Sequence, residues 1–147
     1  MPLLRCSEQR RQSLEEFYSG WTLESNPVSV RIGEAMLAVV AAINTTFVET
    51  KIYGLTSHAH LLLCPEDHVP ADWYISLIAN GQEYCIEYKM TKAHRPWEGA
   101  VMKGATKSPE EFRRYIIIAL FECGGWGKST ELERLYKDVK TANTKNA

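Results

Sequence analysis

The chain has no apolar run long enough to cross a membrane. Its longest one covers only Ala35 to Ile43, whereas a spanning helix needs about 20 residues. The segment from Met1 to Arg11 has an early Arg and no apolar core, unlike a secretory signal. A strong excess of either charge is also missing, because the formal net charge is −1. No overall field favours a membrane or a nucleic acid, and we expect a cytoplasmic protein.

Short recurring patterns are lacking as well. There is no internal repeat or low-complexity segment, and Cys6, Cys64, Cys85 and Cys123 form no CxxC pair, which is typical of reduced, packed thiols in the cytosol. A chain of 147 residues, 45% of them hydrophobic, can bury one core without disulfides. We therefore expect a single domain over 1–140 and a flexible C-terminal tail over 141–147.

Helical periodicity appears at both ends of the chain. Apolar spacing predicts a helix over 7–19, ended by a glycine, and a second helix that begins at Asn26-Pro27 and is buried on most sides. Capping boxes at 108–111 and at Thr130 with Glu133 predict the last two helices.

The middle of the chain is typical of strands. Short runs over 51–55 and 58–64 are followed by a hairpin over 73–90 and a strand near 99–105. Asn80-Gly81 is expected at the centre of a type I′ turn. In that register Ile75 faces Ile86, and Leu77 faces Tyr84.

The predicted order is α-α-β-β-β-β-β-α-α, which indicates an α+β fold. We expect a mainly antiparallel five-stranded sheet with the N-terminal and C-terminal helices packed on one face. The other face would then be partly open to water or to a partner.

Candidate metal ligands occur at His58, His60, Cys64 and His68. On one strand His58 and His60 would point the same way, but Cys64 would lie roughly 13 Å from His60. We predict no metal site, no cofactor and no catalytic residue. A small metal-assisted hydrolase using His58, His60 and His68 is the enzymatic alternative.

Charge is segregated along the chain. No Lys or Arg occurs from Ile52 to Tyr88, whereas the segment from Lys89 to Lys107 is rich in both. An acidic sheet face beside a basic rim would attract and orient a protein partner with a basic surface. Trp97 could be an aromatic anchor at that surface or fill the core from its loop. The residues predicted to bind the partner are Tyr74, Glu83, Glu87, Asp72, Glu66, Asp67 and Trp97.

The chain resembles the small bacterial immunity proteins, which neutralise a toxin by direct binding. The resemblance lies in its size, its helix–sheet–helix order, its acidic sheet face, the strand-turn Tyr53 to Ser57 and the helix stop at Gly124-Gly125-Trp126. It implies a non-enzymatic cytosolic inhibitor of a basic toxin, such as a nuclease, and it assigns no residue roles.

Two further hypotheses remain open. A regulator could bind nucleic acid through Lys89 to Lys107, although the acidic sheet beside this segment disfavours that partner. An exposed sheet edge would also permit a homodimer.

Overall fold

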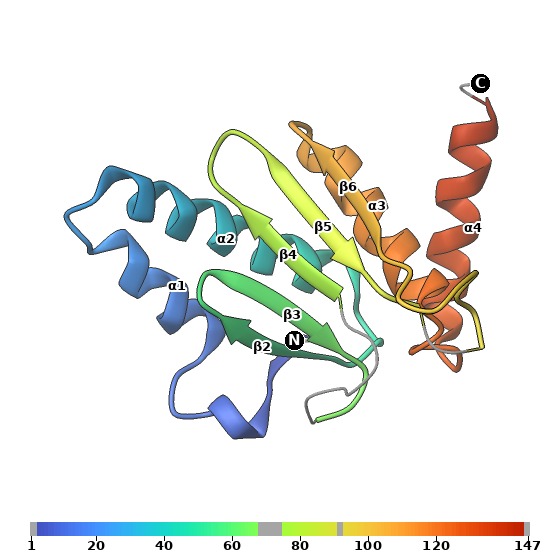
Figure 1. Cartoon of the computed structure of the whole chain (residues 1–147), viewed down its shortest axis with the longest axis horizontal. Helices are drawn as coiled ribbons and strands as arrows, with labels where there is room; N and C mark the ends of the chain where they lie inside the picture. Colours follow the sequence, from blue (N-terminus) through green and yellow to red (C-terminus); the bar gives the residue numbers. More distant parts are fainter. Residues whose placement is uncertain (1–2, 68–74, 91–92, 146–147) are drawn as a thin grey trace.

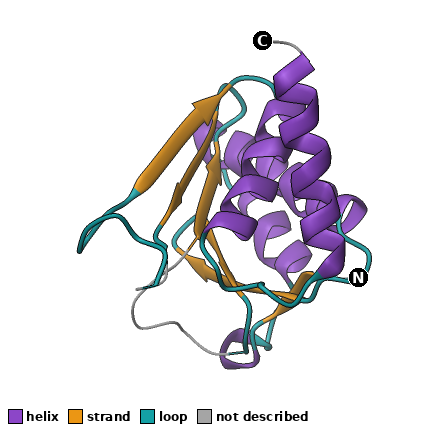
Figure 2. Ribbon diagram, turned by 90° about the vertical axis from the view of Figure 1, so that its right-hand side faces the viewer, coloured by secondary structure: helices purple, strands orange, loops and turns teal. Residues whose placement is uncertain are grey.

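The computed structural model describes residues 3–67, 75–90 and 93–145, with side chains up to residue 142. Over these residues it is an α+β domain in which four α-helices lie on one side of a six-stranded sheet (Figures 1 and 2). The elements in chain order are β1 (Leu3–Arg5), the 3-10 helix η1 (Ser7–Gln9), α1 (Leu14–Thr22), α2 (Pro27–Thr46), β2 (Ile52–Ser57), β3 (His60–Cys64), β4 (Ile75–Ala79), β5 (Tyr84–Tyr88), β6 (Met102–Thr106), α3 (Pro109–Glu122) and α4 (Thr130–Lys145).

The sheet is mixed, and its strand order follows the chain from β1 to β6. β1 runs parallel to β2, because α1 and α2 form the long crossover that a parallel pair requires. The other neighbouring pairs are antiparallel. The α+β class is thus confirmed, but the prediction of five strands preceded by two helices missed β1. A strand of three residues is too short to produce a visible alternation.

Helix boundaries follow side-chain caps, and several predicted boundaries were wrong. The first helix begins at Leu14 instead of residue 7, because Ser13 forms the capping box with Glu16, and it continues through Gly20. Asn26 caps α2 as predicted. Ser129, one residue before the predicted cap, accepts the backbone N–H of Leu132 at the start of α4. That helix extends to residue 145, beyond the tail boundary expected at 141.

The predicted hairpin exists, but its turn lies one residue further along. Ala79 pairs with Tyr84, which leaves Gly81 and Gln82 at the centre of the turn. Gly81 has φ +89°, whereas Asn80 does not have a positive φ, which excludes a type I′ turn over Asn80-Gly81. Asn80 instead uses its side-chain oxygen to accept the N–H groups of Gln82 and Glu83.

The corrected register moves each pairing by two residues and preserves the faces of both strands. Leu77 now faces Ile86, and Ile75 faces Tyr88. These four side chains still point into the core, where α2 and α3 cover the sheet. The predicted alternation therefore located the core correctly even though the turn type was wrong.

Among the helices of the described ranges, only α2 is long and apolar enough to cross a membrane, with a mean hydropathy of 1.4. A core helix of a soluble domain meets the same criterion, and α2 packs against α1 and the sheet. Only 28% of its apolar window is buried, so the expectation of burial on most sides was wrong. Its exposed side carries small alanines such as Ala38, Ala41 and Ala42.

Candidate functional site

The α-helices lie on one side of the sheet (Figure 2), and two of the predicted acidic residues lie on the opposite face. Cys85 of β5 donates its thiol hydrogen to Glu83 Oε1 at 3.3 Å, which places the Glu83 carboxylate on this face. Glu87, two residues after Cys85, forms an ion pair with Lys103 of β6 at 3.2 Å. Glu83, Cys85 and Glu87 therefore form one column along β5, which we call the outer column.

The neighbours of the outer column are set by the strand register. Cys85 lies between Ile78 of β4 and Ala105 of β6, and Glu87 lies opposite Lys103. The centre of this surface is thus weakly polar, and its charged groups stand at the two ends of the column. Such an arrangement has the composition of a small interface core with a charged rim.

The other predicted acidic residues lie elsewhere. Glu66 and Asp67 follow β3 at the end of the sheet opposite the turn that holds Glu83. Asp67 accepts the backbone N–H of Ser7 at 2.7 Å. Tyr74 and Asp72 lie outside the described residues. Of the predicted acidic residues that the structure describes, Glu83 and Glu87 therefore share the outer face, and Glu66 and Asp67 do not.

Trp97 lies in the loop between β5 and β6 and is 67% exposed. Its carbonyl accepts the backbone N–H of Ala100, which defines a local turn. The sequence left open whether Trp97 is exposed or fills the core. In the structure its side chain is exposed and does not fill the core.

The histidine segment forms a strand that begins at His60, two residues later than predicted. Ser57 pairs with His60, so His58 and Ala59 form the turn between β2 and β3, and His58 has φ +53°. His58 and His60 thus do not share a strand face, and His60 Nδ1 lies 3.1 Å from the hydroxyl of Ser76. His68 lies outside the described residues. Among the residues that are described, no group of three His, Cys, Asp or Glu side chains could hold a metal.

Sequence reasoning missed a cleft of about 610 Å³ beside the loop that joins α3 to α4. Glu122 in this cleft accepts one hydrogen bond from Tyr88 at 3.0 Å and another from Tyr136 at 3.1 Å. These residues come from a strand and two helices, so no local pattern connects them. The lining residues are Met90, His94, Phe121, Glu122, Gly124, Trp126, Gly127, Ser129 and Glu133.

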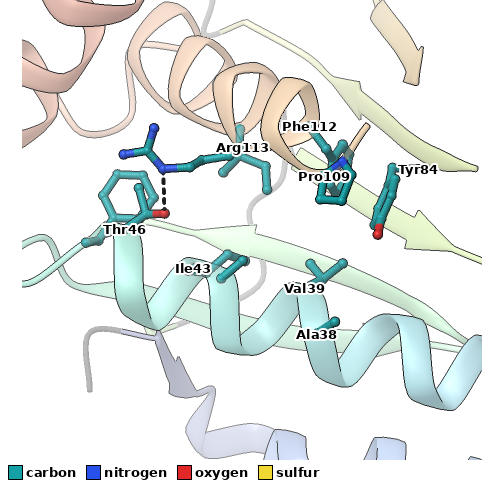
Figure 3. Close-up of a pocket in the computed structure, with 11 residues that line it drawn as sticks. Ala38, Val39, Ile43, Thr46, Tyr84, Pro109, Phe112 and Arg113 are labelled. Carbon is teal, nitrogen blue, oxygen red and sulfur yellow. Dashed lines mark hydrogen bonds between the residues drawn. The ribbon is translucent and has the colours of Figure 1, made fainter. Parts of the chain in front are cut away.

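A second, smaller pocket of about 60 Å³ lies between α2 and α3 (Figure 3). Its walls are mainly apolar, and Arg113 donates from Nε to the Thr46 hydroxyl at 3.1 Å at one end. The guanidinium points away from the pocket interior (Figure 3). The pocket could admit one small aliphatic group, and the Arg113 and Thr46 groups at its end already bond to each other.

The cysteine thiol and the tyrosine phenols of these surfaces favour their neutral forms. Burial, followed by the nearby Glu83 carboxylate, raises the pKa of the Cys85 thiol. Burial and Glu122 together raise the pKa values of Tyr88 and Tyr136, which keeps both as hydrogen-bond donors at neutral pH. The Cys85 thiol is thus a poor nucleophile, because the thiolate is the reactive form.

Comparisons of the chain with protein-family models, with curated proteins and with solved structures find no match.

Proposed function

We propose that this protein is a non-enzymatic protein-binding domain, an immunity-type inhibitor that neutralises a basic toxin such as a nuclease. The outer column and the strands beside it form the proposed binding surface. The observation that carries the proposal is the position of Glu83 and Glu87 on the sheet face that none of the described α-helices covers. Trp97, exposed on the neighbouring loop, is the proposed aromatic anchor.

A basic partner suits this surface for an electrostatic reason. The Glu87 side chain is 41% exposed and its partner Lys103 is 72% exposed, and such exposed pairs contribute less than about 1 kcal/mol. A partner arginine can therefore replace Lys103 at little cost and form a bidentate, charge-assisted contact with Glu87. Glu83 supplies a second carboxylate at the other end of the column. Electrostatic attraction of this kind mainly accelerates association and selects partners.

The test begins with immobilised wild-type protein and the double variant Glu83→Lys/Glu87→Lys, each incubated with lysate of the source organism. A basic protein retained only by the wild type is then purified, and its binding is measured at about 0.05 M and 0.3 M salt. We expect a stoichiometric complex, weaker binding at high salt, and loss of the captured protein's toxic activity in the complex.

Glu24→Lys/Glu34→Lys is the matched control, because it changes the net charge equally at exposed positions on the helical side. It should keep wild-type affinity for the purified partner. Equal weakening by both double variants would mean that only net charge matters, and the proposed surface would be wrong. Wild-type affinity of the Glu83/Glu87 variant would have the same consequence.

A further inference from the structure

The cleft beside the α3–α4 loop has the size of a binding site. Its volume of about 610 Å³ lies within the range of about 300–1,000 Å³ typical of ligand pockets. The end of α3, the glycine-rich loop, the first turn of α4 and the β5–β6 loop each contribute to its lining. These elements lie together on the right of Figure 1.

A fixed carboxylate stands in this cleft. Each oxygen of Glu122 accepts one tyrosine hydroxyl, from Tyr88 and from Tyr136. A carboxylate has about four acceptor positions, so each oxygen retains capacity for a further donor. Because two hydroxyls already hold the group, a ligand that binds it loses little free energy to ordering the side chain.

Aromatic rings line the same cleft as the carboxylate. Phe121 lines the cleft and stacks on Tyr136 with ring centroids 3.9 Å apart. Trp126 forms another part of the wall, with its indole N–H donated to the carbonyl of Lys51. Flat apolar rings beside a carboxylate are the surroundings that a planar guanidinium prefers, because it can stack and form hydrogen bonds at once.

One cation of the chain itself already lies beside this carboxylate and over an aromatic ring. Lys140 places its Nζ 4.0 Å from Glu122 Oε1 and 5.4 Å from the centroid of the Tyr136 ring. Lys140 approaches from α4 and is not among the residues that line the cleft. The ionisable residues in the lining are His94 and two glutamates, Glu122 and Glu133. Each glutamate already has a lysine beside it, Lys140 at 4.0 Å and Lys137 at 3.4 Å. An incoming cation therefore competes with exposed ion pairs, which contribute less than about 1 kcal/mol each.

We propose that this cleft binds an arginine side chain of the partner, through Glu122 and the aromatic wall of Phe121 and Trp126. The inference rests on the proposed function, since it specifies how the partner's basic surface is recognised at a second position. It assigns Glu133, on the cleft rim, a supporting electrostatic role.

The test uses N-acetyl-L-arginine N-methylamide as the probe and its citrulline analogue as the control. Citrulline has nearly the same shape but carries no charge. Both are titrated into isotope-labelled protein, and the amide signals of Gly124 and Gly127 and the indole signal of Trp126 are followed. Arginine should shift these signals saturably, and citrulline should bind at least about tenfold more weakly, because it lacks the charge-assisted contact.

Glu122→Gln should abolish this difference between the two probes. Glu133→Gln, at an exposed position that leaves the tyrosine contacts intact, should reduce arginine binding and provides a second readout if Glu122→Gln perturbs the fold. Glu24→Gln should change neither titration. Equal binding of arginine and citrulline, no saturable shift, or shifts confined to other surfaces would each overturn the inference. The proposed function would survive any of these results if Glu83→Lys/Glu87→Lys still abolished partner binding.

Discussion

Glu131 and Thr50 are joined by two hydrogen bonds across 81 positions of the sequence. Glu131 Oε1 accepts the backbone N–H of Thr50 at 2.9 Å and its hydroxyl at 2.7 Å. The same carboxylate accepts the N–H groups of Val48 and Glu49. The first turn of α4 thereby satisfies the backbone of the segment between α2 and β2, which has no partners of its own within a helix or strand.

Glu131→Gln should destabilise the protein by about 1.5–3 kcal/mol near neutral pH, because hydrogen bonds to a charged group are lost or weakened. Urea unfolding monitored by circular dichroism measures this difference. Glu133→Gln is the control: its ion pair with Lys137 is exposed, and its loss should cost less than about 0.5 kcal/mol. Equal effects of the two substitutions would show that the buried carboxylate has no special role.

The same contact predicts a pH dependence. Burial opposes ionisation of Glu131, but the hydrogen bonds from Thr50, Val48 and Glu49 outweigh it and hold its pKa below the ordinary value. A depressed pKa in the folded state stabilises the fold above the unfolded-state pKa, and this contribution is lost as the pH falls through the folded-state value. The stability difference between wild type and Glu131→Gln should therefore shrink on acidification below about pH 4.5. A constant difference from pH 7 to pH 3 would contradict this assignment.

The parts of the fold that could be predicted are those determined by neighbours in sequence. The cap at Asn26 and the alternation over 75–88 are local features, and both were read correctly. The turn at Asn80-Gly81 was misplaced because an asparagine can either adopt a positive φ or accept hydrogen bonds with its side chain, and the dipeptide does not distinguish these.

The sequence predicted only the part of the candidate site whose residues are related by the periodicity of a single strand. Glu83 and Glu87 share a face because strand periodicity relates them directly. The cleft around Glu122 was not predictable, since Tyr88 and Tyr136 reach it from separate elements that become adjacent only in the fold. The role of Glu131 could not be predicted for the same reason. Nothing near α4 in the sequence indicates that this carboxylate accepts the backbone N–H groups of residues 48–50.

Two helical glycines should respond oppositely to alanine. Gly20, inside α1, has open space around an added Cβ, so Gly20→Ala should stabilise the protein by about 0.5–1 kcal/mol through helix propensity. Gly33, inside α2, has the Tyr18 carbonyl oxygen only 2.8 Å from an added Cβ. Gly33→Ala should cost about 1–3 kcal/mol, because the packed helices must separate.

Thermal unfolding of both variants beside wild type tests this pair. Gly20→Ala should raise Tm and Gly33→Ala should lower it. A decrease of Tm for Gly20→Ala would indicate that this glycine ends the helix, as the sequence had suggested. An unchanged Tm for Gly33→Ala would mean that α1 and α2 are not in close contact.

Cys85 should be the first of the four cysteines to react with iodoacetamide in the folded protein. It is half-buried, whereas Cys6, Cys64 and Cys123 are buried, and burial raises the pKa values of Cys64 and Cys123 to about 12 and about 11. The raised pKa of Cys85 should make it slower than a free thiol at pH 8, with a rate that increases as the pH rises, since only the thiolate reacts.

Cys85 also reports on the proposed binding surface, because its thiol lies between Glu83 and Glu87 on the outer column. A bound partner on that face should exclude the reagent and slow alkylation of Cys85 by at least about tenfold at saturating concentration. Mass spectrometry of peptides from the free and bound protein measures this protection, and Cys123, buried in both states, serves as the internal reference for unfolding. An unchanged Cys85 rate in a saturated complex would place the partner on another surface and remove the outer column from the proposed function.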